Sequence, residues 1–272
     1  MKVSIITINW NNKVGLEQTI KSVFSQSFTD YEFIVIDGNS TDGSVEVIEQ
    51  HKDNIHYWVS EPDSGIYNAM NKGIYTAQGE YCYFLNSGDV FVSDDVLKDV
   101  FRHDLEDNFV CGNIIWDEKG KLRKDDSYKH RDWLFSLYDI YSGFLCHQAF
   151  FVKREMFEEY GYYDETLRIM SDWKHFLIAI GINHEKVQYV DVDIAIYNTD
   201  GLSSTIGGKA ILKEKQKVAR EELSDQVYQE IDRLYYLSRN GFVVDFVHSK
   251  KWIHFLFKVF LKICTTLKLT KL

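Results

Sequence analysis

Three short polar clusters interrupt the N-terminal third of the chain, and each directly follows an apolar run. The clusters are Asn9–Asn12, Asp37–Gly43 and Asn86–Asp89, which follow Val3–Ile8, Phe33–Ile36 and Tyr81–Leu85. Their carboxylates and amides can accept hydrogen bonds from a ligand, and carboxylates can also bind a cation. In an open α/β sheet the parallel strands all end on one side, where ligands bind. The three clusters therefore predict one pocket.

Strand-like and helix-like patterns alternate along this part of the chain. We expect strands at Val3–Ile8, Tyr31–Ile36, His56–Ser60 and Tyr81–Leu85, and helices at Gly15–Phe24, Ser44–His51 and Ile66–Ala77. In the first helix Leu16, Ile20 and Val23 recur at a spacing of three or four residues, which places them on one face. Such alternation predicts β-α-β units with right-handed crossovers, and hence a parallel sheet flanked by helices.

Beyond Asp89 the pattern becomes mixed. We expect strands at Phe109–Trp116, Ala149–Val152, Glu185–Val190 and Val192–Tyr197, a helix over Asp172–Ile180, and a long charged helix from Gly208 to about Arg239. Ser171 is the expected N-cap of the helix over Asp172–Ile180.

Composition excludes several classes of protein. The chain has 272 residues, a formal net charge of −10 and one proline, so it can bury a large core and lacks the basic face that nucleic-acid binding needs. The four cysteines form no C-x-x-C pair, which argues against a zinc site or a disulfide framework. No signal peptide or membrane-spanning run is visible, so we expect a cytoplasmic protein.

Four stretches in fixed order resemble the family 2 glycosyltransferases. They are Val3–Thr7, Val35–Ser44, Glu61–Gly73 and Phe84–Asp89, within a resemblance that covers roughly residues 1–200. Several motifs in order are more specific than any one alone. Members of this family are inverting enzymes of the GT-A fold that use nucleotide sugars. The resemblance implies a Rossmann-like GT-A domain with a mainly parallel central sheet over residues 1–205, a helical extension over 206–272, and a part in bacterial surface polysaccharide biosynthesis.

The resemblance also assigns donor-binding residues. Asp37 and Asp63 match positions that accept hydrogen bonds from the base and ribose of the nucleotide, and Asn9 and Asn86 are placed beside them. A carboxylate accepts donors such as a uracil N–H or a ribose hydroxyl, and a UDP-sugar is the favoured donor. The strand-end placement supports these roles. A plain turn at Asp37 is the simpler alternative.

A divalent cation, Mg²⁺ or Mn²⁺, would stabilise the charge on the departing diphosphate. We expect Asp89 to be its ligand. Many relatives have further acids where this chain has Asn86 and Gly88. With one charged ligand remaining, we expect weak metal affinity that depends on bound nucleotide.

The segment Gly161–Trp173 resembles the family region that supplies the catalytic base, which implies that Asp172 removes the proton from the acceptor hydroxyl. On the local pattern alone, Asp172 could equally be an ordinary acid at a helix start. His147 and Trp173 are expected on the acceptor side. A lone histidine is more often structural, and most aromatic residues belong to the core.

The C-terminal segment Ser249–Leu272 contains six Lys and no acidic residue. On a helix, Trp252–Leu267 gives a broad apolar face opposite a narrow basic stripe, which fits a helix lying on an anionic membrane surface. Packing of that face on the protein's own core or on a second subunit fits equally well. We therefore expect a cytoplasmic enzyme, for which a peripheral place on the inner face of the membrane and a homodimer both stay open.

The predicted function is transfer of a sugar from a nucleotide-sugar donor to a hydroxyl of a glycan or lipid-linked acceptor. One alternative is a non-catalytic nucleotide-binding assembly partner at the membrane, which the missing acids at Asn86 and Gly88 favour. A nucleotidyltransferase is less favoured, because Asn9–Asn12 is not the Gly-rich basic loop that such enzymes place after the first strand.

Overall fold

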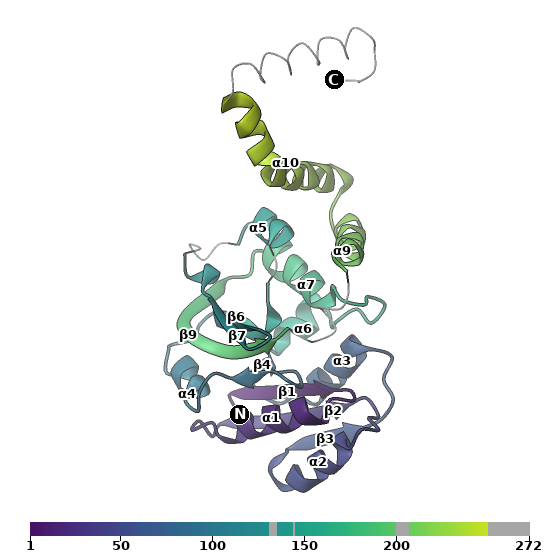
Figure 1. Cartoon of the computed structure of the whole chain (residues 1–272), viewed down its shortest axis with the longest axis vertical. Helices are drawn as coiled ribbons and strands as arrows, with labels where there is room; N and C mark the ends of the chain where they lie inside the picture. The colour runs from purple at the N-terminus through teal and green to yellow at the C-terminus, as the bar shows by residue number, and fades with distance from the viewer. Residues whose placement is uncertain (131–134, 144, 200–206, 250–272) are drawn as a thin grey trace. The chain divides into compact units, whose positions relative to one another are not determined.

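The computed structural model describes residues 1–130, 135–143, 145–199 and 207–249 (Figure 1). Residues Met1–Glu222 form one compact unit, and a second unit begins at Leu223. The division into functional domains at residue 205 stays a prediction.

The first unit opens with alternating strands and helices, as the sequence predicts. These elements are β1 (Val3–Asn9), α1 (Lys13–Phe24), β2 (Tyr31–Asp37), α2 (Ser44–His51), β3 (Tyr57–Ser60), α3 (Ile66–Thr76) and β4 (Tyr81–Phe84). The four strands are parallel, with Ile5 of β1 opposite Phe33 of β2 and Tyr83 of β4. Their carboxyl ends therefore share one edge of the sheet.

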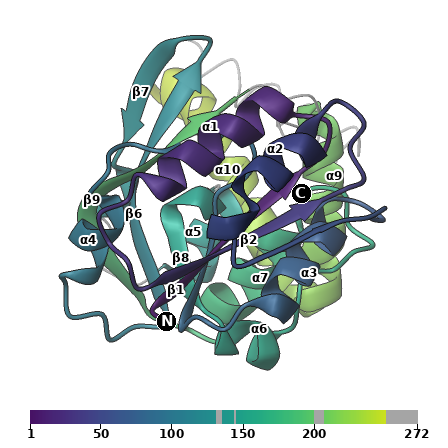
Figure 2. The same cartoon turned by 90° about the horizontal axis from the view of Figure 1, so that it is seen from below.

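Helices cover both faces of this parallel region. Helices α1 and α2 contact each other on one face (Figure 2), whereas α3 packs against β1 and β2. The fully buried residues Leu16, Ile20 and Val23 fix the inner side of α1, and Asn12 caps that helix by accepting the backbone N–H of Gly15 at 3.2 Å.

The rest of the unit extends the sheet. Its elements are β5 (Val90–Phe91), α4 (Val96–Phe101), β6 (Phe109–Glu118), β7 (Lys121–Asp125), α5 (Leu137–Ser142), β8 (Phe150–Lys153), α6 (Glu155–Tyr160), α7 (Ser171–Phe176), β9 (Val187–Asn198) and α9 (Gly208–Glu222). Short helical turns are η1 (Lys52–Asn54), η2 (Ser127–His130), η3 (His147–Ala149) and the π-helical η4 (Leu177–Ile182).

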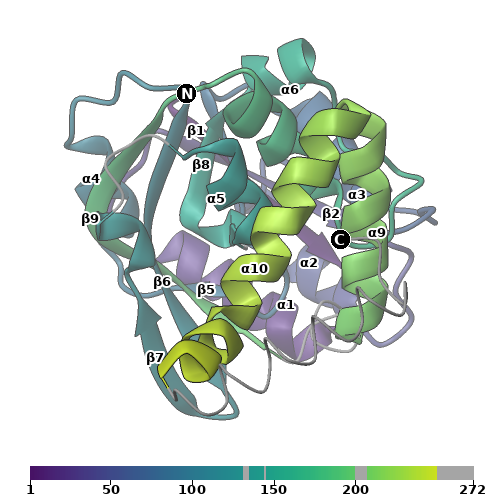
Figure 3. The same cartoon turned by 90° about the horizontal axis from the view of Figure 1, so that it is seen from above.

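The strand order is β3-β2-β1-β4-β8-β6-β9-β5, with β7 paired to β6. Strand β8 runs antiparallel to both β4 and β6, whereas β6 and β9 are parallel. Figure 3 shows the long β6 and β9 side by side, with the β6–β7 hairpin projecting from one end. The result is a mixed α/β fold of the predicted class.

Three local predictions are wrong. The two strands expected between Glu185 and Tyr197 form the single strand β9, because a bulge absorbs the irregularity. Ser171 lies inside α7, not at its cap, and its hydroxyl accepts the backbone N–H of Asp164 instead. The long helix expected from Gly208 divides at Leu223 and Ser224 into α9 and α10 (Asp225–Ser249).

Within the described ranges, none of the helices is long and apolar enough to cross a membrane. Nearly all of the basic segment predicted to lie on a membrane, residues 250–272, falls outside those ranges.

Candidate active site

The ends of β1 and β2 are joined through the carboxylate of Asp37. This side chain is fully buried, and it accepts four hydrogen bonds. Asn9 Nδ2 and Ser40 Oγ donate to Oδ1 at 2.7 and 2.6 Å, and Ser40 N and Ser60 Oγ donate to Oδ2 at 2.9 and 2.6 Å. Four donors match the acceptor capacity of a carboxylate. In this arrangement Asp37 and Asn9 organise the loops at the edge of the sheet, and their contact with a nucleotide stays a prediction.

Asp63 lies over the end of β2 because residue 38 is a glycine. A Cβ added at Gly38 would lie 2.5 Å from Asp63 Oδ2 and 3.2 Å from Trp10 Cδ1. Asp63 Oδ1 accepts the backbone N–H of Gly65 at 3.0 Å, while Trp10 is 70% exposed. An acidic acceptor and an open aromatic face thus meet above one glycine. Sequence reasoning selected Asp63 but passed over Trp10, whose signal was a large aromatic residue in an otherwise polar strand-end cluster.

Asp89 is buried at 4% exposure and is held by two other elements. Gln148 Nε2 donates to Oδ2 at 3.1 Å, and the backbone N–H of Asn198 donates to Oδ1 at 2.9 Å. Burial raises the pKa of the Asp89 carboxyl to about 6. Asp89 therefore connects the loop after β4 to η3 and to the end of β9.

Asp89 offers a divalent cation a single carboxylate. Each of its oxygens accepts one protein donor, and the neighbouring positions, Asn86 and Gly88, carry no charge. Such cations prefer several oxygen ligands, usually carboxylates. In the part of the chain that the structure describes, no three His, Cys, Asp or Glu side chains form a group suited to a metal. Metal ligation by Asp89 stays a prediction.

Asp172 lies in the first turn of α7 at 7% exposure. Its Oδ1 accepts the Tyr67 hydroxyl at 3.0 Å and the backbone N–H of Trp173 at 2.8 Å. Its Oδ2 lies 3.1 Å from His147 Nδ1. The other ring nitrogen of His147, Nε2, lies 3.2 Å from Asn86 Nδ2. Three residues chosen from the sequence, Asn86, His147 and Asp172, therefore meet.

A pocket opens onto this group. Among the described residues that line this pocket, Asp172 alone carries a carboxylate. The lining residues are Ile66, Tyr67, Met70, Cys146, His147, Gln148, Arg168, Ile169, Asp172 and Tyr197. A single buried carboxylate beside a cavity is the arrangement that one general base needs.

Trp173 lies in the core, which corrects its expected place on the acceptor side. It is 1% exposed, and its indole N–H donates to the carbonyl of Ile140 at 2.9 Å. Lys215 Nζ lies 4.9 Å from the centre of its ring. With both faces covered, the ring supports α7 and offers no surface to an acceptor.

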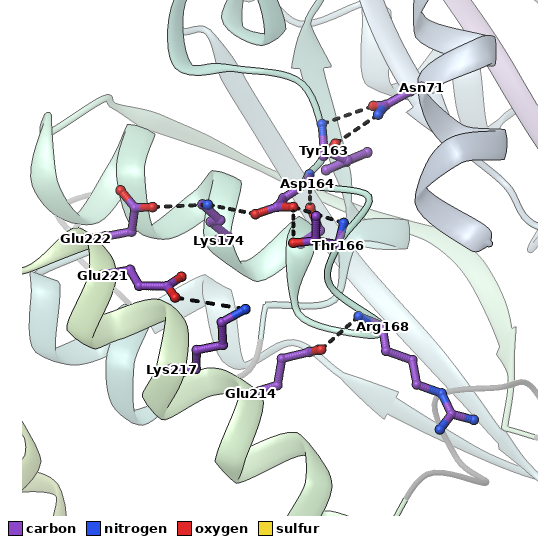
Figure 4. A network of polar contacts seen from close by, with 11 residues as sticks. Asn71, Tyr163, Asp164, Thr166, Arg168, Lys174, Glu214, Lys217, Glu221 and Glu222 are labelled. Carbon is purple, nitrogen blue, oxygen red and sulfur yellow. Dashed lines mark hydrogen bonds and ion pairs between the residues drawn. The ribbon is translucent and has the colours of Figure 1, made fainter. Parts of the chain in front are cut away.

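Helix α9 braces the segment that carries Asp172 (Figure 4). The Glu214 carboxylate accepts the backbone N–H groups of Arg168, Ile169 and Met170 at 2.8, 2.8 and 3.0 Å. Lys174 of α7 pairs with Asp164 at 3.0 Å. It also pairs with Glu222 of α9 at 3.1 Å. Nothing in the sequence pattern marked Glu214, because its partners are backbone groups about 45 residues away.

On the far side of the same segment, α3 makes a second brace. Asn71 Oδ1 accepts the backbone N–H of Tyr163 at 3.0 Å, and Asn71 Nδ2 donates to the Tyr163 carbonyl at 2.8 Å (Figure 4). The segment before Asp172 is thus fixed from two helices.

Comparison with known proteins supports this fold. Over 218 residues the chain is 29% identical to a PGL/p-HBAD biosynthesis glycosyltransferase of Mycobacterium bovis. The aligned region covers 77% of this chain and 82% of the relative. The structure resembles S. aureus TarS 1-349 solved with UDP-GlcNAc, with a TM-score of 0.66, 16% identity, and coverage of 89% of this chain and 73% of the other.

It also resembles the mannosyltransferase PcManGT of Pyrobaculum calidifontis, solved with GDP-Man and Mn²⁺, with a TM-score of 0.57 and 14% identity over 97% of this chain and 80% of the other. These two likenesses show the GT-A fold. The model of glycosyl transferase family 2 matches residues 4–161, which is more than half of the chain. The chain therefore belongs to glycosyl transferase family 2.

Proposed function

We propose that this glycosyltransferase moves a sugar from a nucleotide-sugar donor to a hydroxyl of a glycan or lipid-linked acceptor, with inversion at the anomeric carbon. The proposal rests on the Asp172 carboxylate, which is held between His147 and Tyr67 at the wall of a pocket. Membership of a glycosyltransferase family favours sugar transfer over the two alternatives that the sequence raised, a non-catalytic binding partner and a nucleotidyltransferase.

In the proposed reaction Asp172 takes the proton of the acceptor hydroxyl as that oxygen attacks the anomeric carbon. The attack comes from the side opposite the diphosphate, which leaves with the bonding electron pair. A positioned general base contributes roughly 10²- to 10⁴-fold to such a step. Arg168 lines the same pocket and offers its guanidinium to the negative charge that develops on the diphosphate.

The donor nucleotide would lie at the ends of β1 and β2. Asp63 Oδ2 is the acceptor for a base N–H or a ribose hydroxyl, and Trp10 offers its exposed ring to a flat base or sugar face. The nucleotides named for the two similar structures, UDP-GlcNAc and GDP-Man, support a nucleoside diphosphate sugar as the donor class. A UDP-sugar is our first choice.

A thermal-shift screen tests the donor site. The panel comprises UDP, GDP, CDP and TDP and their sugars, each with and without Mn²⁺. Ligand that binds only the folded protein raises its stability by mass action. One nucleotide class should stabilise the wild type, and Asp63→Ala should lose that shift. Asp53→Ala, an exposed position in η1, is the matched control. Absence of a shift with every nucleotide would contradict the donor site.

A further inference from the structure

A continuous chain of side chains joins the end of β4 to the proposed base. Asn86 Nδ2 lies 3.2 Å from His147 Nε2, and His147 Nδ1 lies 3.1 Å from Asp172 Oδ2. The Tyr67 hydroxyl donates to the other oxygen of Asp172 at 3.0 Å. The side chains of His147 and Asp172 are only 15% and 9% exposed. The chain therefore lies mostly out of water, where hydrogen bonds orient their partners most strongly.

The hydrogen-bonding chemistry fixes the tautomer of His147. An ionised carboxylate only accepts, so the proton of a neutral imidazole must be on Nδ1, facing Asp172. Nε2 is then an acceptor, and the Asn86 amide presents its nitrogen there. That orientation leaves Asn86 Oδ1 buried, with no partner among the described residues. The amide thus serves His147 although its own oxygen goes unpaired.

The remaining contacts hold the carboxylate from its other side. Tyr67 is 5% exposed, and burial together with the nearby Asp172 raises the pKa of its hydroxyl well above the usual value. The hydroxyl therefore stays protonated and donates. The rings of Phe84 and His147 pack in a T-shaped arrangement, with ring centres 6.3 Å apart and an interplanar angle of 85°. His147 is packed and bonded in one orientation.

We propose that His147 is a positioning residue, which donates through Nδ1 to Asp172 and is itself held in the correct tautomer by Asn86. This inference rests on the proposed function, because it assigns Asp172 as the base. It differs from the role expected from the sequence, in which His147 touches the acceptor. It also couples the β4 strand end, where the donor was expected, to the group that activates the acceptor.

Three variants separate the two hydrogen bonds of His147. The amide nitrogen of asparagine is as many bonds from Cα as Nδ1, so His147→Asn keeps the donor to Asp172 and loses the contact with Asn86. His147→Gln places its amide near the position of Nε2, so it keeps the contact with Asn86 and loses the donor to Asp172. His147→Ala loses both.

We expect kcat to fall roughly 10- to 100-fold in His147→Gln and His147→Ala, because a carboxylate displaced by about 1 Å can cost 10²-fold. His147→Asn keeps the donor to Asp172, so its kcat should fall less than that of His147→Gln, and the KM values for donor and acceptor should stay within about 2-fold in all three variants. Thermal unfolding of each variant checks that it folds. Equal losses in the Asn and Gln variants, or a raised acceptor KM at unchanged kcat, would overturn the inference.

A second measurement needs no activity. Proton–nitrogen correlation spectra of the full chain report the imidazole tautomer, with the His147 signals assigned by their loss in His147→Asn. The inference requires the proton on Nδ1, and a proton on Nε2 alone would contradict it. If the tautomer is as expected but the wild type transfers no sugar from any donor, the proposed function fails and the positioning geometry stands.

Discussion

Glu214 offers a quantitative test of how α9 supports the site. Its carboxylate accepts three backbone N–H groups, those of Arg168, Ile169 and Met170, just before the turn that carries Asp172. Met170 is 1% exposed and Arg168 is exposed, so water can replace the carboxylate at one end of this segment only. Hydrogen bonds to a charged group contribute about 1.5–3 kcal/mol each, and a buried donor left unpaired costs about 1–3 kcal/mol.

Because water replaces part of the interaction, we expect Glu214→Ala to lower the free energy of unfolding by about 2–4 kcal/mol. At roughly 2–4 °C per kcal/mol for a unit of this size, Tm falls by about 4–16 °C. Glu214→Gln keeps a neutral acceptor but turns an NH₂ group toward the same donors, so its loss should be smaller. Urea denaturation followed by circular dichroism measures both variants.

The matched control is Glu221→Ala on the same helix. Glu221 pairs with Lys217 at 3.9 Å, with side chains 49% and 54% exposed, and such surface pairs contribute about 0–1 kcal/mol. Transfer activity should also fall in Glu214→Ala under conditions where the variant is fully folded, because the loop before Asp172 is released. If Glu214→Ala is as stable and as active as Glu221→Ala, the bracing role of α9 is refuted.

Three further predictions concern single residues. Burial lowers the pKa of His175 to about 4, despite the Gly161 carbonyl that favours the charged form. Between pH 4 and 6.5 the native state therefore binds fewer protons than the unfolded chain. The free energy of unfolding should fall by on the order of 3 kcal/mol as the pH drops from 6.5 toward 4. His175→Phe should flatten this pH dependence in denaturation curves, and an unchanged slope would contradict it. Asp89→Asn keeps an acceptor for the Asn198 N–H, so its melting temperature should be higher than that of Asp89→Ala. Equal melting temperatures of the two variants would argue against the structural role of Asp89. Calorimetry of the wild-type apo protein with Mn²⁺ alone should give no measurable binding. Trp10→Ala should weaken nucleotide binding by about 1–3 kcal/mol, roughly 5- to 150-fold in Kd, and an unaltered Kd would exclude stacking on Trp10.

The parallel half of the fold could be predicted because its strands and helices follow simple periodicities. β1 to β4 and their helices match the expected bounds to within two residues at each end, and α2 matches them fully. Antiparallel β8 could not be oriented from sequence, because its direction depends on the long connection from β7. The division of the C-terminal helix also escaped prediction, since no glycine or proline marks the break at Leu223 and Ser224.

The site shows a similar contrast. Asp172 and His147 were found because their segments resemble the family, and the structure brings them within 3.1 Å of each other. The sequence could not show that Ser40 and Ser60 saturate the carboxylate of Asp37, or that the ring of Trp173 is buried. Both depend on which face a side chain takes in the folded chain. Such placement is set by tertiary packing, which local patterns do not encode.

The most direct test of the account measures sugar transfer by Asp172→Asn. The donor identified by thermal shift is incubated with a lipid extract as acceptor, and release of the nucleoside diphosphate is followed for the wild type and the variant. The amide keeps the shape of the carboxylate but cannot take a proton, so donor binding should be unchanged while the transfer rate falls at least roughly 100-fold. Transfer by Asp172→Asn within a few-fold of the wild-type rate would show that another group is the base.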